Sequence, residues 1–179
     1  LATEILVGRL PLRAWDHAVD QWVQRVNFLS PHLEIPPIGE EERRFLIEQL
    51  CEGTYSFKEV ERRPVIPLVR GWLNGAQQSL VETHAPERLE LPNGRRPKLT
   101  YVAGAPPFLS AKIQDLYGIS SIPRIAAGRV TPVVHILAPS NRPVQITQDL
   151  AGFWRDHYPK LKRELQRKYP KHEWRDAPD

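Results

Sequence analysis

The spacing of apolar residues changes once along this chain of 179 residues, close to residue 84, and that change limits the fold more than any other feature. Before it, apolar residues recur at helical spacing; after it, short segments alternate between apolar and polar residues. A group of helices followed by short strands predicts an α+β fold. We expect a helical accessory subdomain over residues 1–83 and a basic α+β domain over residues 84–179.

Four helices are predicted in the first part, as a small helical assembly. They cover residues 12–29, stopped at Ser30-Pro31, residues 40–50, stopped at Gly53, a short segment capped by Ser56 and stopped before Pro64, and residues 67–80.

The second part is predicted to form a small antiparallel β-sheet or a partial barrel, with flanking helices. The expected elements are a hairpin over residues 88–102, a short helix over residues 107–118, strands over residues 130–137 and 144–147, and a long helix over residues 150–169. Asn93-Gly94 marks the hairpin, because both residues tolerate positive φ. Pro132 should stand at a strand start or edge, and Pro159 should kink or restart the last helix. Asp149 is expected to cap that helix.

Positive charge is concentrated in the second part. Residues 1–83 carry 9 Lys and Arg against 12 Asp and Glu, whereas residues 84–179 carry 16 against 9. Clustered cations recruit polyanions, although a solvated helix face shows the same pattern. On the last helix the apolar residues share one side, and the predicted opposite side holds Arg155, Lys160, Lys162, Arg163 and Arg167. A basic helix side of this kind can contact phosphates, face solvent or lie on an anionic membrane, and of these three we favour the membrane least.

Catalytic motifs are not recognisable. The chain lacks the P-loop, Gly-x-Gly-x-x-Gly and Gly-x-Ser-x-Gly patterns, and its 6 histidines show no metal-ligand spacing. Cys51 follows Leu50 on a predicted helix and is interpreted as a small core residue. We therefore expect no catalytic residue, no metal site and no cofactor in this chain.

Two further features bear on the cellular compartment of the protein and on whether the chain is part of a longer one. A single cysteine is typical of a reducing compartment, and neither a long apolar run nor a secretory signal is visible, so we expect a cytoplasmic protein without a membrane partner. Because the chain contains no methionine and begins with Leu1, we expect it to be part of a longer protein.

Several motifs of the second part occur together in one order. They are Leu89–Tyr101 with its Asn93-Gly94-Arg95 turn, Leu109–Gly118, Ala127–Val130, Leu137-Ala138-Pro139, Arg142–Thr147 followed by Phe153-Trp154, and Tyr169–Trp174. Together they resemble the C-terminal region of the bacterial HrpB family of DExH-box ATP-dependent RNA helicases, strongly over residues 84–176 and more weakly before. The chain departs from that family's pattern at Lys112, where arginine is expected, and at Arg175, where proline is expected.

The resemblance implies a parent protein that hydrolyses ATP in two RecA-like domains, so that ATP and Mg would bind upstream of this chain. It implies an accessory role here, with RNA, the helicase core of the same chain or another protein as partner. In the first hypothesis the basic part binds RNA without sequence preference. Its predicted contacts are Arg95, Arg96 and Lys98 at the hairpin, Arg129 and Arg142 at strand ends, and the five cations of the last helix.

In the alternative hypothesis the chain is a protein-docking or structural element without nucleic-acid contact, and tryptophans are its candidate anchors. Helical spacing predicts core positions for Trp15, Trp22, Trp72 and Trp154, which leaves Trp174 to argue for a partner. A clasp that holds the C-terminal tail is the favoured interpretation of Trp174.

Overall fold

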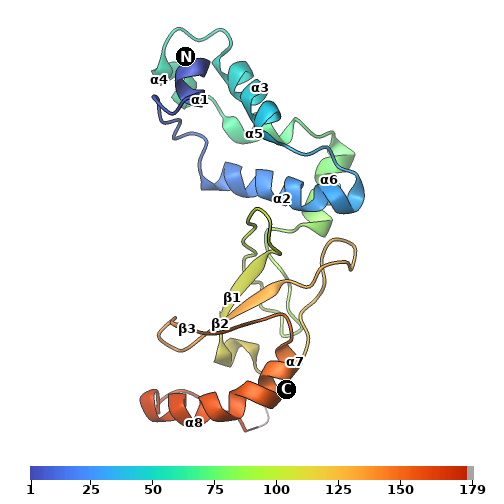
Figure 1. Ribbon diagram of the computed structural model, residues 1–179, viewed down its shortest axis with the longest axis vertical. Helices are drawn as coiled ribbons and strands as arrows, with labels where there is room; N and C mark the ends of the chain where they lie inside the picture. Colours follow the sequence, from blue (N-terminus) through green and yellow to red (C-terminus); the bar gives the residue numbers. More distant parts are fainter. Residues whose placement is uncertain (177–179) are drawn as a thin grey trace. The chain divides into compact units, whose positions relative to one another are not determined.

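The computed structural model describes residues 1–176, so residues 177–179 of the predicted second part lie outside the described residues. The chain divides into two compact units, Leu1–Ala85 and Pro86–Asp179. The first unit consists of helices, whereas the second combines a small sheet with helices (Figure 1). The expected α+β class is confirmed.

The helices of the first unit follow one another through short connections. They are α1 (Ala2–Leu6), α2 (His17–Leu33), α3 (Glu40–Cys51), α4 (Phe57–Arg62), α5 (Val65–Arg70) and α6 (Gly75–His84). The predicted cap of α4 is confirmed, because the Ser56 hydroxyl accepts a hydrogen bond from the amide of Glu59 at 3.3 Å. Gly53 follows α3 with a φ of 71°, the left-handed conformation predicted for it.

Several predictions for the first unit are wrong: α1 was not predicted, and α2 begins at His17, after the cap Asp16, and not at residue 12. Helix α2 continues through Pro31 and ends before Glu34, which has a φ of 55°. Proline removes one hydrogen bond, but the buried side of α2 outweighs that loss. The predicted helix 67–80 is two helices, α5 and α6, because Asn74 starts a new one. Its side chain accepts from the amide of Gln77 at 2.8 Å, while the Gln77 side chain accepts from the amide of Asn74 at 3.0 Å.

The core of the first unit is apolar except for one arginine. Arg25 of α2 is only 6% exposed, and its guanidinium donates to the carbonyl of Ala85 at 2.7 Å and to Glu82 at 2.9 Å. Arg70 donates to the other oxygen of Glu82 at 3.0 Å. Partial burial opposes ionisation of Glu82, but the two arginines outweigh it and lower the pKa of this carboxyl. The charge of this buried cation is thus balanced by the carboxylate of Glu82.

The sheet of the second unit has three strands in the order β1-β2-β3. Strand β1 (Phe108–Lys112) runs parallel to β2 (Val133–Leu137), and β3 (Pro143–Thr147) runs antiparallel to β2. The sheet is mixed and open, which corrects the expectation of an antiparallel sheet or partial barrel. Residues 113–132 join β1 to β2 and are long enough for the crossover that parallel strands need. Pro132 stands directly before β2, as predicted.

The predicted helix over residues 107–118 is mostly wrong. Residues 108–112 form β1, and only Ile113–Leu116 are helical, as the 3₁₀ helix η1. Leu109 and Ala111 are buried while Ser110 between them is exposed. Apolar residues four apart, such as Leu109 and Ile113, share a side in a strand as well as in a helix, and burial of one side of the sheet decides for the strand.

The predicted hairpin is present but carries little regular pairing. Its arms join at the antiparallel bridge between Arg88 and Lys98, and Gly94 turns the chain with a φ of 83°. Pro92 and Pro97 lack the amide that a ladder requires, so the arms do not extend into strands.

The last helix is built from three segments, α7 (Leu150–Gly152), the π-helix η2 (Phe153–His157) and α8 (Tyr158–Lys168). Asp149 caps it, accepting a hydrogen bond from the amide of Gly152 at 2.9 Å. Pro159 lies in the first turn of α8, where its missing amide is harmless, so the predicted restart is confirmed.

Aromatic side chains fill the core beneath this helix. Trp154 is 4% exposed, and its indole N–H donates to the carbonyl of Ile119 at 2.7 Å. Its ring centroid lies 5.0 Å from that of Phe153 and 5.1 Å from that of Tyr158. Trp22 is buried as predicted, whereas the other two tryptophans assigned to core positions, Trp15 and Trp72, are half-buried.

Two tyrosines hold the chain after α8. The hydroxyl of Tyr117 donates to the carbonyl of Glu173 at 3.1 Å, and that of Tyr158 donates to the carbonyl of Arg175 at 2.6 Å. Burial raises the pKa of Tyr158, so its hydroxyl remains a donor. Trp174 is half-buried and donates to the carbonyl of Tyr169 at 2.9 Å, which agrees with the predicted clasp.

Candidate nucleic-acid interface

The ten cations predicted to contact RNA lie in the second unit, and all except Lys162 are exposed. Four have an acidic partner: Arg95 with Asp115 at 3.1 Å, Lys98 with Glu87 at 4.0 Å, Arg155 with Asp156 at 2.9 Å, and Lys162 with Asp176. Within residues 1–176, ion pairs are absent at Arg96, Arg142, Lys160, Arg163 and Arg167. Arg129 lies in the turn closed by the Ile125–Val130 bridge, and Arg142 directly precedes β3.

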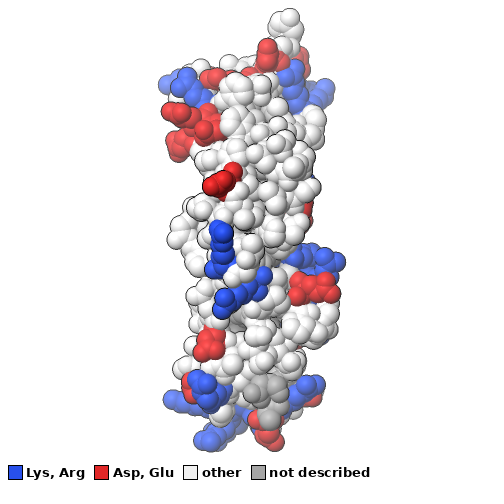
Figure 2. All heavy atoms as spheres, turned by 90° about the vertical axis from the view of Figure 1, so that its right-hand side faces the viewer, with Lys and Arg blue, Asp and Glu red and all other residues white. Residues whose placement is uncertain are grey.

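Helix α8 places three of the cations in one row. Lys160, Arg163 and Arg167 follow at spacings of three and four residues, which makes them neighbours on the helix surface. They lie opposite Tyr158 and Leu165, which are buried at 1% exposure each. Figure 2 shows Lys and Arg gathered over the end of the second unit that α8 forms, with acidic side chains among them. We call these three residues the α8 row.

Two cations predicted for the same side of the helix lie elsewhere. Lys162 comes four residues after Tyr158 and three before Leu165, so it shares their buried side, where it pairs with Asp176. Arg155 lies in the π-helix, whose wider turn changes the angular spacing assumed in the prediction, and it pairs with the adjacent Asp156. The α8 row is therefore narrower than the predicted basic side.

A second group of predicted cations borders a groove. Arg95 and Arg96 at the hairpin turn, together with Ser110 of β1, line a pocket of about 370 Å³. The groove opens because β1 pairs with the hairpin only at the bridge between Thr100 and Phe108 and then separates from it. The amide and carbonyl of Phe108 bond Thr100 and not β2, so those of Ser110, two residues on, also point away from β2, toward this groove.

One side of the sheet faces solvent beside the groove, and we call it the outer face. Residues of each strand alternate, so those between the buried positions point outward together. They include Phe108, Ser110 and Lys112 of β1 and His135 of β2, and the antiparallel register places Ile146 of β3 beside His135 on the same side. The rings of Phe108 and His135 are stacked, with centroids 4.2 Å apart and planes at 5°.

Sequence reasoning missed the outer face. It placed Phe108 and Lys112 on a helix and named no residue of β2 as a contact. The signal that was available is the alternation of residues 108–112 and 133–137, since aligning these two segments as strands brings the aromatic side chains together.

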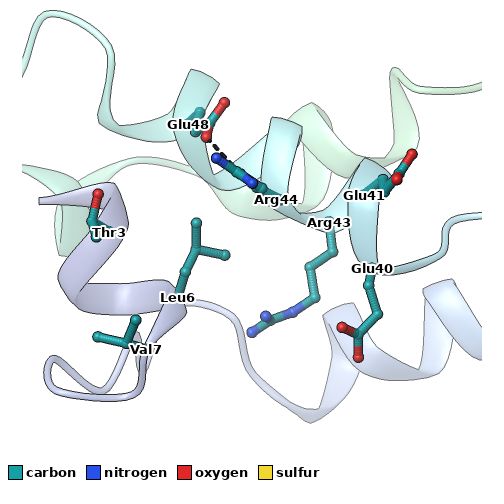
Figure 3. A pocket seen from close by; sticks show the side chains of 8 residues that line it. All are labelled: Thr3, Leu6, Val7, Glu40, Glu41, Arg43, Arg44 and Glu48. Atoms are coloured by element: carbon teal, nitrogen blue, oxygen red, sulfur yellow. Dashed lines mark hydrogen bonds and ion pairs between the residues drawn. The ribbon is translucent and has the colours of Figure 1, made fainter.

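The first unit contains a groove of another character, about 590 Å³ in volume, between α1 and α3. Figure 3 shows Leu6 projecting from α1 toward α3, where Arg44 and Glu48 pair with each other at 3.0 Å. Its lining mixes apolar side chains with charged ones, of which Arg44 and Glu48 pair, and holds no nucleophile beside a base. Partial burial raises the pKa of the nearby Cys51 thiol, which disfavours the reactive thiolate.

Residues 1–176 contain no cluster of three or more His, Cys, Asp or Glu side chains arranged to hold a metal ion. None of the helices described is long and apolar enough to cross a membrane.

Comparison with known proteins identifies relatives of the whole fold. A family model described as "ATP-dependent helicase C-terminal" matches residues 46–178. The ATP-dependent RNA helicase HrpB of Escherichia coli K12 is 34% identical over 126 residues, a match that covers 70% of this chain but only 16% of that protein. Two crystal structures of E. coli HrpB, one described as a DExH-box NTPase and the other as a DEAH/RHA helicase, superpose with TM-scores of 0.85 and 0.74.

Both solved structures are 28% identical to this chain; they cover 99% and 97% of it, and the chain covers 23% of each. The resemblance noted in the motifs of the second part is therefore confirmed, and the similarity extends through the helices of the first unit. This chain belongs to the HrpB-type family of ATP-dependent helicase C-terminal regions.

Proposed function

We propose that this chain is an accessory region of a larger ATP-dependent helicase and that its second unit binds RNA without sequence preference. The α8 row carries the proposal: Lys160, Arg163 and Arg167 are exposed, adjacent on one helix and not paired with any acidic group within residues 1–176. Cations that are already neutralised gain little from a phosphate, whereas unpaired ones release counterions when they bind it. The name of the E. coli relative, an RNA helicase, indicates RNA as the polyanion.

The hairpin cations extend this surface. Arg96 is exposed and makes no ion pair in the described part of the chain, and Arg95 pairs with Asp115 at an exposed position. Exposed pairs of this kind are worth little, so a phosphate can take the place of the carboxylate. Each contact is to the backbone of the nucleic acid and reads no sequence.

Replacing the α8 row by K160Q, R163Q and R167Q is expected to weaken RNA binding by about a hundredfold at 100 mM salt. The slope of log affinity against log salt should fall by about 2, because each lost phosphate contact to a single strand removes about 0.7. Fluorescence anisotropy with labelled RNA, titrated between about 50 and 200 mM salt, measures both quantities.

A matched variant removes three exposed cations of the first unit, R9Q, K58Q and R62Q, and has the same net charge. It should leave the salt slope of RNA binding unchanged. Equal losses in the two variants would show that net charge alone attracts RNA. Absence of salt-sensitive RNA binding in the unaltered chain would remove the proposal.

A second candidate function is docking on the ATPase core, and the exposed apolar residues of the first unit favour it. Val7 and Phe45, beside the groove between α1 and α3, are 59% and 47% exposed. Exposed aromatic side chains are frequent contact sites whose truncation costs about 1–2 kcal/mol of docking energy. In a helicase that contains this chain, F45A should change the maximal RNA-stimulated ATPase rate, whereas the α8 row variant should shift the RNA concentration at half-saturation. An unaltered maximal rate in F45A would argue against docking at this surface.

A further inference from the structure

We propose that the outer face of the sheet binds unpaired nucleobases, so that the chain prefers single-stranded RNA to duplex RNA. The inference rests on the proposed function, RNA binding by the second unit, and adds the form of the substrate. It is carried by the stacked rings of Phe108 and His135 and by the cations around them.

The stacked pair is a surface that a base can extend. The two rings are 4.2 Å apart and nearly parallel, at 5°, and both residues are half-buried. His135 lies on the central strand, so the side of its ring away from Phe108 faces β3. There the register places Ile146, 60% exposed, directly opposite His135. An apolar side chain and an aromatic ring at the same place suit the faces of a nucleobase, which are apolar and stack on aromatics of any kind.

Cations surround the pair on the same face. Lys112 lies on β1 two residues beyond Ser110, the register partner of His135. Lys98 lies on the neighbouring hairpin arm, two residues before Thr100, the bridge partner of Phe108. Leu99 between them is buried, so Lys98 and Thr100 point outward with Phe108. A strand of RNA with bases on the ring pair would have its phosphates within reach of these lysines.

We expect the adjacent groove to hold the RNA backbone where it extends beyond the ring pair. Ser110 belongs both to the outer face and to the groove lined by Arg95 and Arg96. Duplex RNA has its bases stacked inside the helix and offers only phosphates and groove edges, so it can use the cations but not the rings. A difference between the two forms of RNA is therefore the property to measure.

The first test uses the intact 179-residue chain and needs no substitution. Labelled oligouridine of about 12 nucleotides, the same strand paired with oligoadenosine, and an abasic strand of equal length and charge are compared by anisotropy. We expect the abasic strand and the duplex to bind about tenfold more weakly than oligouridine, because neither offers a free base. Equal affinities for all three would overturn the inference and leave the proposed function standing, whereas binding of none of them would overturn both.

The second test removes the ring from Phe108. F108L keeps an apolar side chain in β1 and should lower the affinity for oligouridine by about tenfold, with the salt slope and the affinities for duplex and abasic strand unchanged. Y55L, at an exposed tyrosine of the first unit, is the matched control and should change nothing. A lower melting temperature in F108L with unchanged oligouridine binding would show that the ring pair only stabilises the sheet, and would contradict the inference.

Discussion

A Trp154→Ala variant is expected to lose about 4 kcal/mol of the free energy of unfolding of the second unit. Trp154 is almost fully buried and packs against Phe153 and Tyr158, so truncation leaves a large cavity among aromatic rings. The carbonyl of Ile119 also loses its donor in a buried place. Hydrogen exchange of the intact chain measures the effect, because it reports the two units separately.

Trp154→Phe is the matched control for the cavity. It keeps most of the ring volume and removes the hydrogen bond to Ile119, so we expect a loss of about 1–2 kcal/mol. Protection of amides in the first unit should remain as it was in both variants. If Trp154→Ala were no worse than Trp154→Phe, the packing of the aromatic core would not be what holds the last helix to the second unit.

Arg25→Ala is expected to destabilise the first unit by about 3 kcal/mol. The substitution leaves the fully buried carbonyl of Ala85 without its donor and removes one of the two arginines from Glu82. It also removes a guanidinium that lies 5.2 Å from the centre of the Trp22 ring. Urea unfolding followed by hydrogen exchange in α2 and α6 measures the loss.

Arg70→Ala is the control that shows whether the cost of Arg25→Ala comes from the buried position of Arg25 or only from losing an ion pair with Glu82. Arg70 also bonds Glu82, but its side chain is 33% exposed, so its removal should cost about 1 kcal/mol or less. The two arginines lower the pKa of Glu82, and their stabilisation is therefore present above the ordinary pKa of a carboxyl and lost as the pH falls through the lower folded value. The stability difference between the unaltered chain and Arg25→Ala should narrow at such acidic pH. Similar costs for Arg25→Ala and Arg70→Ala would contradict the role assigned to the buried site.

The elements that sequence predicted correctly are those with strong local signals. The helix over residues 40–50 has an acidic first turn and a terminal glycine, and β3 is a short segment with strand-forming residues. Residues 108–112 failed because a five-residue apolar pattern fits two periodicities, and only pairing with β2, a contact between distant segments, selects one. The prediction of a single helix over residues 67–80 failed for another reason. The capping box of Asn74 and Gln77, which starts α6, is a local signal that can be read from the sequence.

The candidate interface also contains features that the sequence predicts and features that it does not. Charge and exposure are local, so the basic second part and the α8 row could be anticipated from Lys160, Arg163 and Arg167. The side of Lys162 could also be predicted, because its spacing from Tyr158 and Leu165 places it with them, and only its pairing with Asp176 depends on the tail. The pairing of Phe108 with His135 depends on a parallel register across a long connection, which neighbouring residues do not encode.

The way the tail is attached bears on how its sequence can change. Tyr117 and Tyr158 bond the carbonyls of Glu173 and Arg175, groups that every amino acid supplies, proline included. Substitution of either tyrosine therefore removes an anchoring bond, whereas substitution at position 173 or 175 leaves the bonded carbonyl in place. Position 175 holds arginine where the family resemblance leads us to expect proline. Either residue supplies the backbone carbonyl that Tyr158 bonds, so the attachment of the tail tolerates this exchange.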